Sequence, residues 1–201
     1  MNFSKPDLTA LLRPQSVAVI GASTNQHKVG GVPVALLSTL GFAGRVVPVH
    51  PDAREIQGIP AVKSILDALQ PVDLAIVAVP VQHAERVMRE CAAAGVKAVI
   101  MFTSGFAEMG GAGVAQQENL TRIAAEAGML LLGPNCLGVM NLRARLFATF
   151  SPAPLAGIPP MGKIGLVSQS GAFGGYAYSM AREASLRLSQ WVTRDVPGLI
   201  N

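Results

Sequence analysis

Short runs of β-branched and other apolar residues alternate along the chain with longer segments whose apolar positions recur at helical spacing. The short runs are typical of buried strands, and the helical spacing is typical of helices that cover them. Repeated alternation of this kind between residues 17 and 132 predicts a parallel, doubly wound α/β sheet with right-handed crossovers. We expect strands at residues 17–20, 45–49, 74–79, 98–102 and 129–132, and helices at residues 32–40, 65–69, 83–94 and 115–127.

The composition changes after Phe150. Residues 151–162 contain four prolines and two glycines, which cannot continue a helix or a central strand, so we interpret them as a linker. A sheet of two strands with one helix, as expected beyond the linker, buries too little surface to be stable alone. The pattern therefore predicts a first domain at residues 1–150 and an incomplete second domain at 163–201, with strands at 163–167 and 188–192 around a helix at 173–184.

Half of the 201 residues are apolar, 5% are aromatic and 14% are charged, which fits a parallel sheet of small aliphatic residues covered by helices. The mean hydropathy is +0.41. The longest clean apolar run, residues 74–81, is nevertheless far shorter than the roughly 18 to 20 residues of a membrane-spanning helix. The start of the chain has no basic region followed by an apolar stretch, so we expect no signal peptide and a cytoplasmic location.

The net charge of +4 comes without a run of basic residues, and the aromatic residues are not interleaved with basic ones, so we do not expect a nucleic acid partner. Cys91 and Cys136 are too few for a disulfide framework and lack metal-ligand spacing, which fits a reducing compartment and predicts no metal site. We expect Cys91 to be a small buried residue inside a helix.

A loop rich in glycine and serine joins the first predicted strand to the next helix. It begins with Gly21, Ala22 and Ser23, and the helix begins near Gly30. Backbone N–H groups and the positive end of a helix dipole favour an anion at such a junction. Lys28 lies in the same loop and supplies a cation, although a tight turn with solvated charges is the alternative.

An NAD(P) site is a less favoured interpretation of this loop. The G-x-G-x-x-G spacing is absent, and the second strand is followed by His50 and Pro51, where an NAD site carries a carboxylate for the ribose. Asp52 is the nearest carboxylate, and Arg54 is a further cation after this strand. This alternative keeps the same α/β fold and assigns NAD(P) as the ligand of the loop.

Several candidate residues follow the other strands, at the edge where parallel sheets bind ligands. Val79 and Pro80 form either an apolar wall or a simple strand terminator. Glycine and asparagine allow the backbone to approach a ligand closely. Cys136 has no histidine nearby in sequence, so we interpret it as a neighbour of the ligand and not as a nucleophile. The candidate residues after the fourth and fifth predicted strands are Ser104, Gly105, Asn135 and Cys136.

A second turn of the same chemistry lies after the linker. Ser168, Ser170 and Gly171 stand between a predicted strand and a predicted helix. The nucleophile elbow G-x-S-x-G is not spelled here, and no histidine follows His83, which disfavours a hydrolase. Anion binding by the hydroxyl and N–H groups is the better interpretation.

Several motifs occur in one order along residues 12–192: the loop from Gly21 to Gly30, then GFAGRVVPVHP, VDLAIVAVP, SGFAEMG, GPNCLGVMN and GKIGLVSQSGAFG. In this order they resemble the CoA-binding half of the NDP-forming acyl-CoA synthetases, relatives of the succinyl-CoA synthetase α-subunit. The resemblance implies a Rossmann-like CoA-binding domain followed by the start of a flavodoxin-like domain. It also implies that coenzyme A contacts Gly21, Ala22, Ser23, Lys28, Gly30, Pro51, Val79, Pro80, Ser104, Gly105, Asn135 and Cys136.

In that family a phosphoryl group passes from the nucleotide to a histidine of the second domain, and an acyl phosphate is then attacked by CoA. None of His27, His50 and His83 matches that position, and after LSQWV the chain departs from the family pattern. We therefore expect a truncated chain that binds CoA, has no catalytic residue of its own and does not catalyse ligation alone. ATP and magnesium would act only in the complete enzyme, and the partners would be the missing ligase and ATP-grasp domains or a separate subunit.

A non-catalytic alternative comes from the same resemblance. Related bacterial protein acetyltransferases fuse this module to an acetyltransferase domain, where it would sense CoA or acyl-CoA. The acyl substrate and the choice between ATP and GTP depend on parts that this sequence does not contain.

Overall fold

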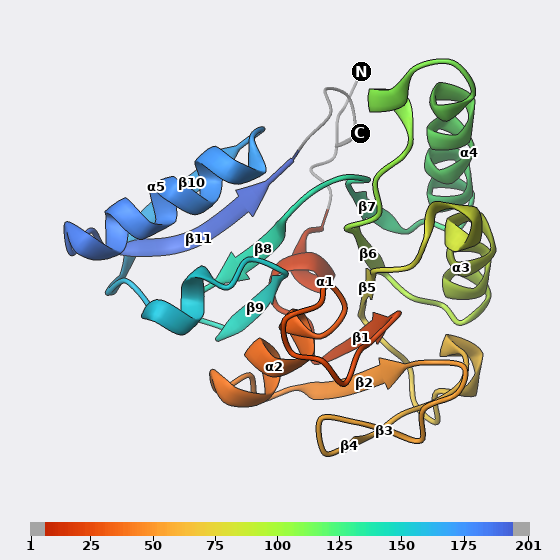
Figure 1. Ribbon diagram of the computed structural model, residues 1–201, viewed down its shortest axis with the longest axis horizontal. Helices are drawn as coiled ribbons and strands as arrows, with labels where there is room; N and C mark the ends of the chain where they lie inside the picture. Colours follow the sequence, from red (N-terminus) through yellow and green to blue (C-terminus); the bar gives the residue numbers. More distant parts are fainter. Residues whose placement is uncertain (1–6, 195–201) are drawn as a thin grey trace.

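The computed structural model describes residues 7–194, and its first sheet confirms the predicted parallel α/β fold (Figure 1). Its strands lie in the order β2-β1-β5-β6-β7, and all pairs are parallel. Numbered along the chain within this sheet, the order is 2-1-3-4-5, so the direction of winding reverses between β1 and β5. Ligands of doubly wound sheets bind at that reversal. The strands are β1 (Ser16–Ile20), β2 (Arg45–Val49), β5 (Leu74–Val77), β6 (Ala98–Met101) and β7 (Leu130–Leu132).

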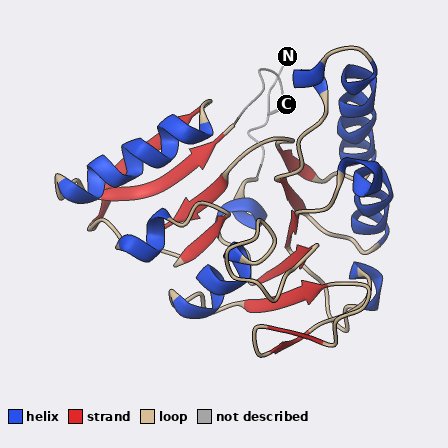
Figure 2. Ribbon diagram, in the orientation of Figure 1, coloured by secondary structure: helices blue, strands red, loops and turns tan. Residues whose placement is uncertain are grey.

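Helices cover both faces of this sheet (Figure 2). On one face α3 (Val81–Ala93) and α4 (Ala112–Glu126) bury side chains against alternate strand positions such as Ala18 and Val77. On the other face α1 (Thr9–Leu12) and α2 (Val32–Thr39) pack against the intervening positions. Every residue of β1, β5 and β6 is buried, which is why these strands are continuously apolar. Within residues 7–194, no helix combines the length and the apolar composition that a membrane crossing requires.

The connection between β2 and β5 differs from the prediction. The helix expected at residues 65–69 is only a 3₁₀ turn, η1 (Ile65–Asp67). Ser64 and Asp67 form a capping box at its start, but the backbone is already extended at Ala68, which ends it. Before it lies a small unpredicted hairpin of β3 (Glu55–Ile56) and β4 (Ile59–Pro60).

A second, mixed sheet follows, and the expectation of only two strands is wrong. Its order is β10-β11-β8-β9, with β10 parallel to β11 and the remaining pairs antiparallel. The helix α5 (Gly171–Glu183) packs against this sheet, and the segment read as a linker contains the 3₁₀ turn η3 (Ala153–Ala156). The strands are β8 (Gly138–Asn141), β9 (Leu146–Thr149), β10 (Met161–Ser168) and β11 (Leu188–Thr193).

The β8–β9 hairpin belongs to both halves of the molecule. Val139 and Ala148 pack into the core of the first sheet, whereas Met140 and Phe147 pack with Trp191 beneath α5. Successive strand residues point to opposite faces, so one hairpin can contribute side chains to both cores. The hairpin precedes the predicted linker yet hydrogen-bonds to β11 beyond it. The division at residues 150 and 163 stays a prediction, and the second sheet extends across it.

Candidate functional site

The loop at residues 21–31 leaves β1 at the point where the winding of the sheet reverses. The N–H groups of Gly21 and Ala22 donate to the carbonyl oxygen of Val49 at 3.1 and 3.3 Å, which ties the loop to β2. Gly21 has a φ of +85°, and a Cβ there would lie 2.4 Å from the carbonyl oxygen of Ala78, just beyond β5. Only glycine fits both the conformation and this close approach.

The two ends of the loop meet. A Cβ on Gly30 would lie 1.9 Å from the carbonyl oxygen of Gly21, and the N–H of Ser23 donates to the carbonyl oxygen of Gly30 at 3.3 Å. In the middle, the N–H of Lys28 donates to the carbonyl oxygen of Asn25 at 3.1 Å. The loop is therefore a closed, compact turn that leads directly into α2.

Several N–H groups of this turn are not paired within the described chain. Along the described chain, the backbone N–H groups of Thr24, Gln26, Val29 and Gly30 donate to no protein acceptor. Lys28 is exposed in the same turn and makes no ion pair with any described residue. Unpaired backbone donors, a lysine and a helix N-terminus together form an anion-binding arrangement.

Gln57, at the tip of the β3–β4 hairpin, holds this loop and was missed by sequence reasoning. Its side-chain Nε2 donates to the carbonyl oxygens of Ser23 at 2.9 Å and Gly31 at 3.0 Å. The Gln57-Gly58 pair between short apolar runs is a hairpin signal that could have located the turn, but not its contact with the loop.

The predicted residues after β5, β6 and β7 form a continuous edge beside the loop. A Cβ on Gly21 would lie 3.1 Å from Cγ1 of Val79, so these two residues are neighbours. The buried Thr103, which sequence reasoning also missed, donates from Oγ1 to the carbonyl oxygen of Val79 at 2.8 Å and accepts at its own carbonyl from the N–H of Asn135 at 2.9 Å. Gly105 lies against the side chain of Val81 at the start of α3. The structure thus brings Val79, Gly105 and Asn135 to one edge of the sheet.

Pro80 and Ser104 are exposed at this same edge. At the far end, Pro51 and Arg54 are exposed in the turn that follows β2. His50 shapes that turn, since its Nδ1 accepts from the N–H groups of Asp52 at 3.2 Å and Ala53 at 3.1 Å.

The two cysteines have different surroundings but are both buried. Burial inside α3 raises the pKa of Cys91 to about 12, which confirms its interpretation as a small core residue. The Sγ of Cys136 lies 3.6 Å from the carbonyl oxygens of Met101 and Leu132, and its side chain packs in the core. Its predicted place beside the ligand stays a prediction.

The second predicted turn lies against the segment that follows β7. A Cβ on Gly171 would lie 2.7 Å from Cδ1 of Leu137. The Oγ of Ser168 donates to the carbonyl oxygen of Ser170 at 2.8 Å, and the Oγ of Ser170 accepts from the N–H of Phe173 at 3.2 Å, which caps α5. The two hydroxyl groups therefore stabilise the turn, and its role as an anion site stays a prediction.

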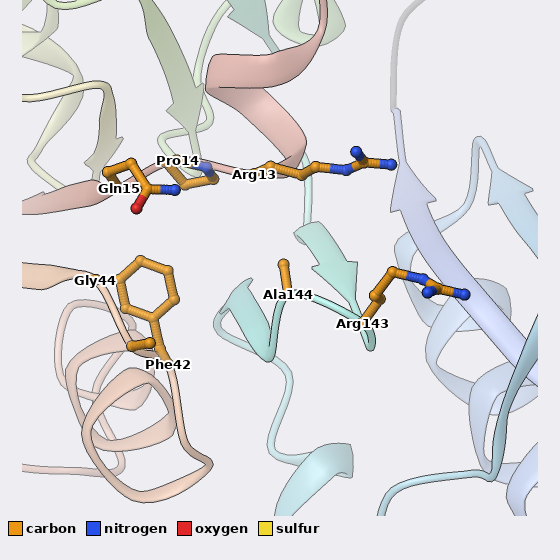
Figure 3. A pocket seen from close by; sticks show the side chains of 8 residues that line it. Arg13, Pro14, Gln15, Phe42, Gly44, Arg143 and Ala144 are labelled. Carbon is orange, nitrogen blue, oxygen red and sulfur yellow. The ribbon is translucent and has the colours of Figure 1, made fainter.

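Among residues 7–194, no group of three or more His, Cys, Asp and Glu side chains is placed to hold a metal ion. A pocket of about 280 Å³ lies instead at the amino ends of β1 and β2, lined in part by Gln15, Phe42 and Gly44. Its Arg13 and Arg143 extend to the same side (Figure 3), at the opposite edge of the sheet from the loop.

A Rossmann-like sheet whose first strand runs through a glycine-rich loop into a helix defines a class of proteins that bind phosphate-bearing cofactors at the reversal point. Within that class, residues 15–141 match the family described as CoA binding domain, and the chain belongs to this family.

Curated relatives and solved structures agree with this assignment. The chain is 38% identical over 172 residues to ADP-forming acetate-CoA ligase II of Archaeoglobus fulgidus, a match that covers 86% of this chain and 25% of that one. It is 38% identical over 177 residues to subunit alpha of ADP-forming acetate-CoA ligase II of Pyrococcus furiosus, covering 88% of this chain and 37% of that one. The dinucleotide-forming acetyl-coenzyme A synthetase 1 of Ca. Korarchaeum cryptofilum superposes with a TM-score of 0.88 at 35% identity, over 94% of this chain and 40% of that one.

The predicted similarity to succinyl-CoA synthetase is also confirmed. A succinate-CoA ligase subunit alpha 2 of Archaeoglobus fulgidus is 30% identical over 125 residues, covering 58% of this chain and 38% of that one. The chain spans between about a quarter and two-fifths of the length of these relatives.

Proposed function

We propose that this chain binds coenzyme A along the carboxyl edge of the first sheet, as the CoA-binding part of an ADP-forming acyl-CoA synthetase. The observation that carries the proposal is the closed loop at residues 21–31, with its unpaired N–H groups at the reversal point, in a chain of the CoA-binding domain family. The phosphate groups of CoA supply the anion that such an arrangement favours.

The edge of the sheet suggests how the rest of the ligand would lie. The phosphates would bind the loop and Lys28, and the adenosine would extend toward Pro51. The pantetheine arm would follow Val79 and Pro80 to Ser104, Gly105 and Asn135, so that the thiol end would face the second sheet. The turn at Ser168, Ser170 and Gly171 would meet a phosphoryl group there.

The whole reaction would require further protein. An acyl-CoA synthetase of this kind makes acyl-CoA from a carboxylic acid, CoA and ATP through a phosphohistidine, and none of His27, His50 and His83 matches that position. We therefore expect that this chain alone does not catalyse ligation. Its partners would be a ligase domain and an ATP-grasp domain, and the name of the Pyrococcus relative as subunit alpha fits a division between chains.

Calorimetric titration of the folded chain with CoA tests the binding proposal. We expect binding that weakens when the 3′-phosphate is removed from the ligand, and no competition from NADH. Lys28→Ala should weaken binding about three- to tenfold through the loss of one charge-assisted contact. Lys163→Ala, which removes an exposed lysine from β10, is the matched control and should leave affinity unchanged. No binding of CoA by the folded protein would overturn the proposal.

Incubation with ATP labelled at the γ-phosphate tests the catalytic part separately. We expect no transfer of label to the chain. Covalent labelling of His27, His50 or His83 would show that this chain carries its own phosphoryl acceptor.

A further inference from the structure

The side chain of Gln57 hydrogen-bonds the β3–β4 hairpin to the loop at residues 21–31. The register of the hairpin pairs Ile56 with Ile59, so Gln57 and Gly58 form a two-residue turn. Gln57 reaches from that turn to both ends of the loop, at the carbonyl oxygens of Ser23 and Gly31. One amide group therefore bridges two points that are eight residues apart in the chain.

The backbone at this turn is unusual for glutamine. Gln57 has a φ of +53° and Gly58 a φ of +83°, which is the pattern of a type I′ turn. The first position of that turn favours asparagine, aspartate or glycine, because other side chains are strained at positive φ. Such a conformation persists where the surrounding structure holds the residue, here through the two hydrogen bonds of the Gln57 amide.

The hairpin is itself anchored, so the amide is held in place. Ile56 is 1% exposed and packs in the core of the first sheet. At the base of the hairpin, the N–H of Val62 donates to the carbonyl oxygen of Pro48 at 3.0 Å, and the N–H of His50 donates to that of Val62 at 2.9 Å. The Gln57 side chain therefore connects the loop, through the anchored hairpin, to β2.

The two acceptors lie at functionally different points. Ser23 is at the beginning of the turn that carries the unpaired N–H groups, and Gly31 is the residue that precedes α2. The carbonyl oxygen of Gly31 also accepts from Ala35 in the first turn of that helix at 3.1 Å. Fixing both points fixes the direction of the loop N–H groups relative to the helix.

We propose that Gln57 is a positioning residue that holds the 21–31 loop in its anion-binding shape, so that affinity for the phosphates of CoA depends on the β3–β4 hairpin. This inference rests on the proposed function. The energetic reason is pre-organisation: a loop that is already ordered loses less conformational freedom when the ligand binds.

Gln57→Asn separates this role from a purely structural one. Asparagine suits the type I′ turn better than glutamine, so the melting temperature should stay the same or rise. Its amide is one methylene shorter and cannot reach both carbonyl oxygens. We expect CoA to bind about tenfold more weakly, as measured by calorimetric titration, from the loss of two hydrogen bonds that pre-organise the loop.

Two further variants complete the test. Gln57→Met keeps the length of the side chain but has no donor, and it should lose affinity to a similar extent. Gln116→Asn changes an exposed glutamine of α4 and should alter neither affinity nor stability. Equal affinity of Gln57→Asn, Gln57→Met and the unchanged protein would overturn the proposal.

Hydrogen exchange without ligand supplies a readout that does not need CoA. Amides of residues 22–31 should exchange faster in Gln57→Asn than in the unchanged protein, whereas the strands of the first sheet should not change. Unchanged exchange in the loop would overturn the positioning role of Gln57 even if affinity fell. If the unchanged protein bound no CoA, the proposed function would fail, and the exchange measurement would still decide whether Gln57 orders the loop.

Discussion

The two sheets of this protein have similar apolar strands but very different surroundings. In the first sheet β1, β5 and β6 are buried along their whole length. In the second sheet the edge strand β10 exposes Met161 at 48%, Ile164 at 49% and Val167 at 74%. Phe173 and Tyr176 of α5 are also more than 60% exposed. An apolar run therefore predicts a strand, but it does not tell which of its faces the described chain covers.

The difference extends to the glycines. Those of the first sheet's loop stand where a side chain would collide with backbone, as at Gly21 and Gly30. Gly165 of β10 has no atom within 4 Å of the position that a Cβ would take. Gly21 and Gly30 are thus required by the geometry of the loop, whereas the geometry of β10 does not require Gly165.

The largest expected effect comes from exchanging Gly30 for alanine, with Gly165→Ala as the comparison. Gly30→Ala places a methyl group 1.9 Å from the carbonyl oxygen of Gly21, so the loop must open. We expect the free energy of unfolding to fall by about 3 kcal/mol and CoA affinity to fall at least a hundredfold, on the order of the largest overpacking costs. Gly165→Ala should change stability by less than about 0.5 kcal/mol.

Urea denaturation and calorimetric titration of the two variants check this contrast. A Gly30→Ala protein that binds CoA normally would show that the loop tolerates a side chain. A Gly165→Ala protein as destabilised as Gly30→Ala would erase the distinction between the two regions.

Truncation of one core residue and one edge residue should change stability without a direct effect on the loop. Ile76→Ala removes a fully buried side chain of β5 and should lower the free energy of unfolding by about 3 kcal/mol. Val167→Ala removes a largely exposed side chain and should cost about 0.5 kcal/mol or less. Trp191 is fully buried in the second core and is the only tryptophan, so its fluorescence reports that region.

The β8–β9 hairpin contributes side chains to both cores, so we expect the two sheets to unfold together. In Ile76→Ala, the unfolding transitions followed by tryptophan fluorescence and by far-ultraviolet circular dichroism should therefore have the same urea midpoint. Two separate midpoints would mean that the sheets unfold independently.

The smallest expected effect depends on pH and concerns the amino-terminal edge of the first sheet. The hydrogen bond from Lys97 lowers the pKa of Asp73, and the N–H of Gln15 also donates to this carboxylate at 2.9 Å. A carboxyl group whose pKa is lower in the folded state stabilises the fold above its unfolded pKa of about 3.9 and loses that contribution as pH falls through its folded pKa.

Asp73→Asn should therefore lower the free energy of unfolding by about 1 kcal/mol at pH 7, since Lys97 is largely exposed and the pair is partly screened. The difference from the unchanged protein should shrink below about pH 4. Asp52→Asn, at an exposed carboxyl group, is the control. Urea midpoints measured from pH 3 to pH 7 check the prediction, and a difference that grows as the pH falls would contradict the sign.

The parts predicted correctly from the sequence are those with local causes. The strands of the first sheet follow from apolar runs, and the loop from Gly21 to Gly30 follows from a strand that runs into a glycine-rich turn. The resemblance to CoA-binding domains was visible because several such local motifs occur in a fixed order.

The parts that were missed depend on residues far apart in the chain. Gln57 bonds to Ser23 and Gly31 across 34 and 26 positions, and Thr103 connects the segments that follow β5 and β7. The hairpin at residues 138–149 was missed because its strands are short and its partner β11 lies beyond a proline-rich segment. The helix expected at residues 65–69 is one turn because the backbone becomes extended at Ala68, although Ser64 and Asp67 cap its start.

The sequence by itself determined where the strands of the first sheet occur, that a glycine-rich turn follows the first of them, and that the core is built from small aliphatic residues. The tertiary structure alone decided which strand ends lie together, how Gln57 holds the loop, and that one hairpin joins two cores. The physical reason is that periodicity and turn chemistry act over a few residues, whereas register, burial and hydrogen bonds between distant segments exist only once the chain has packed.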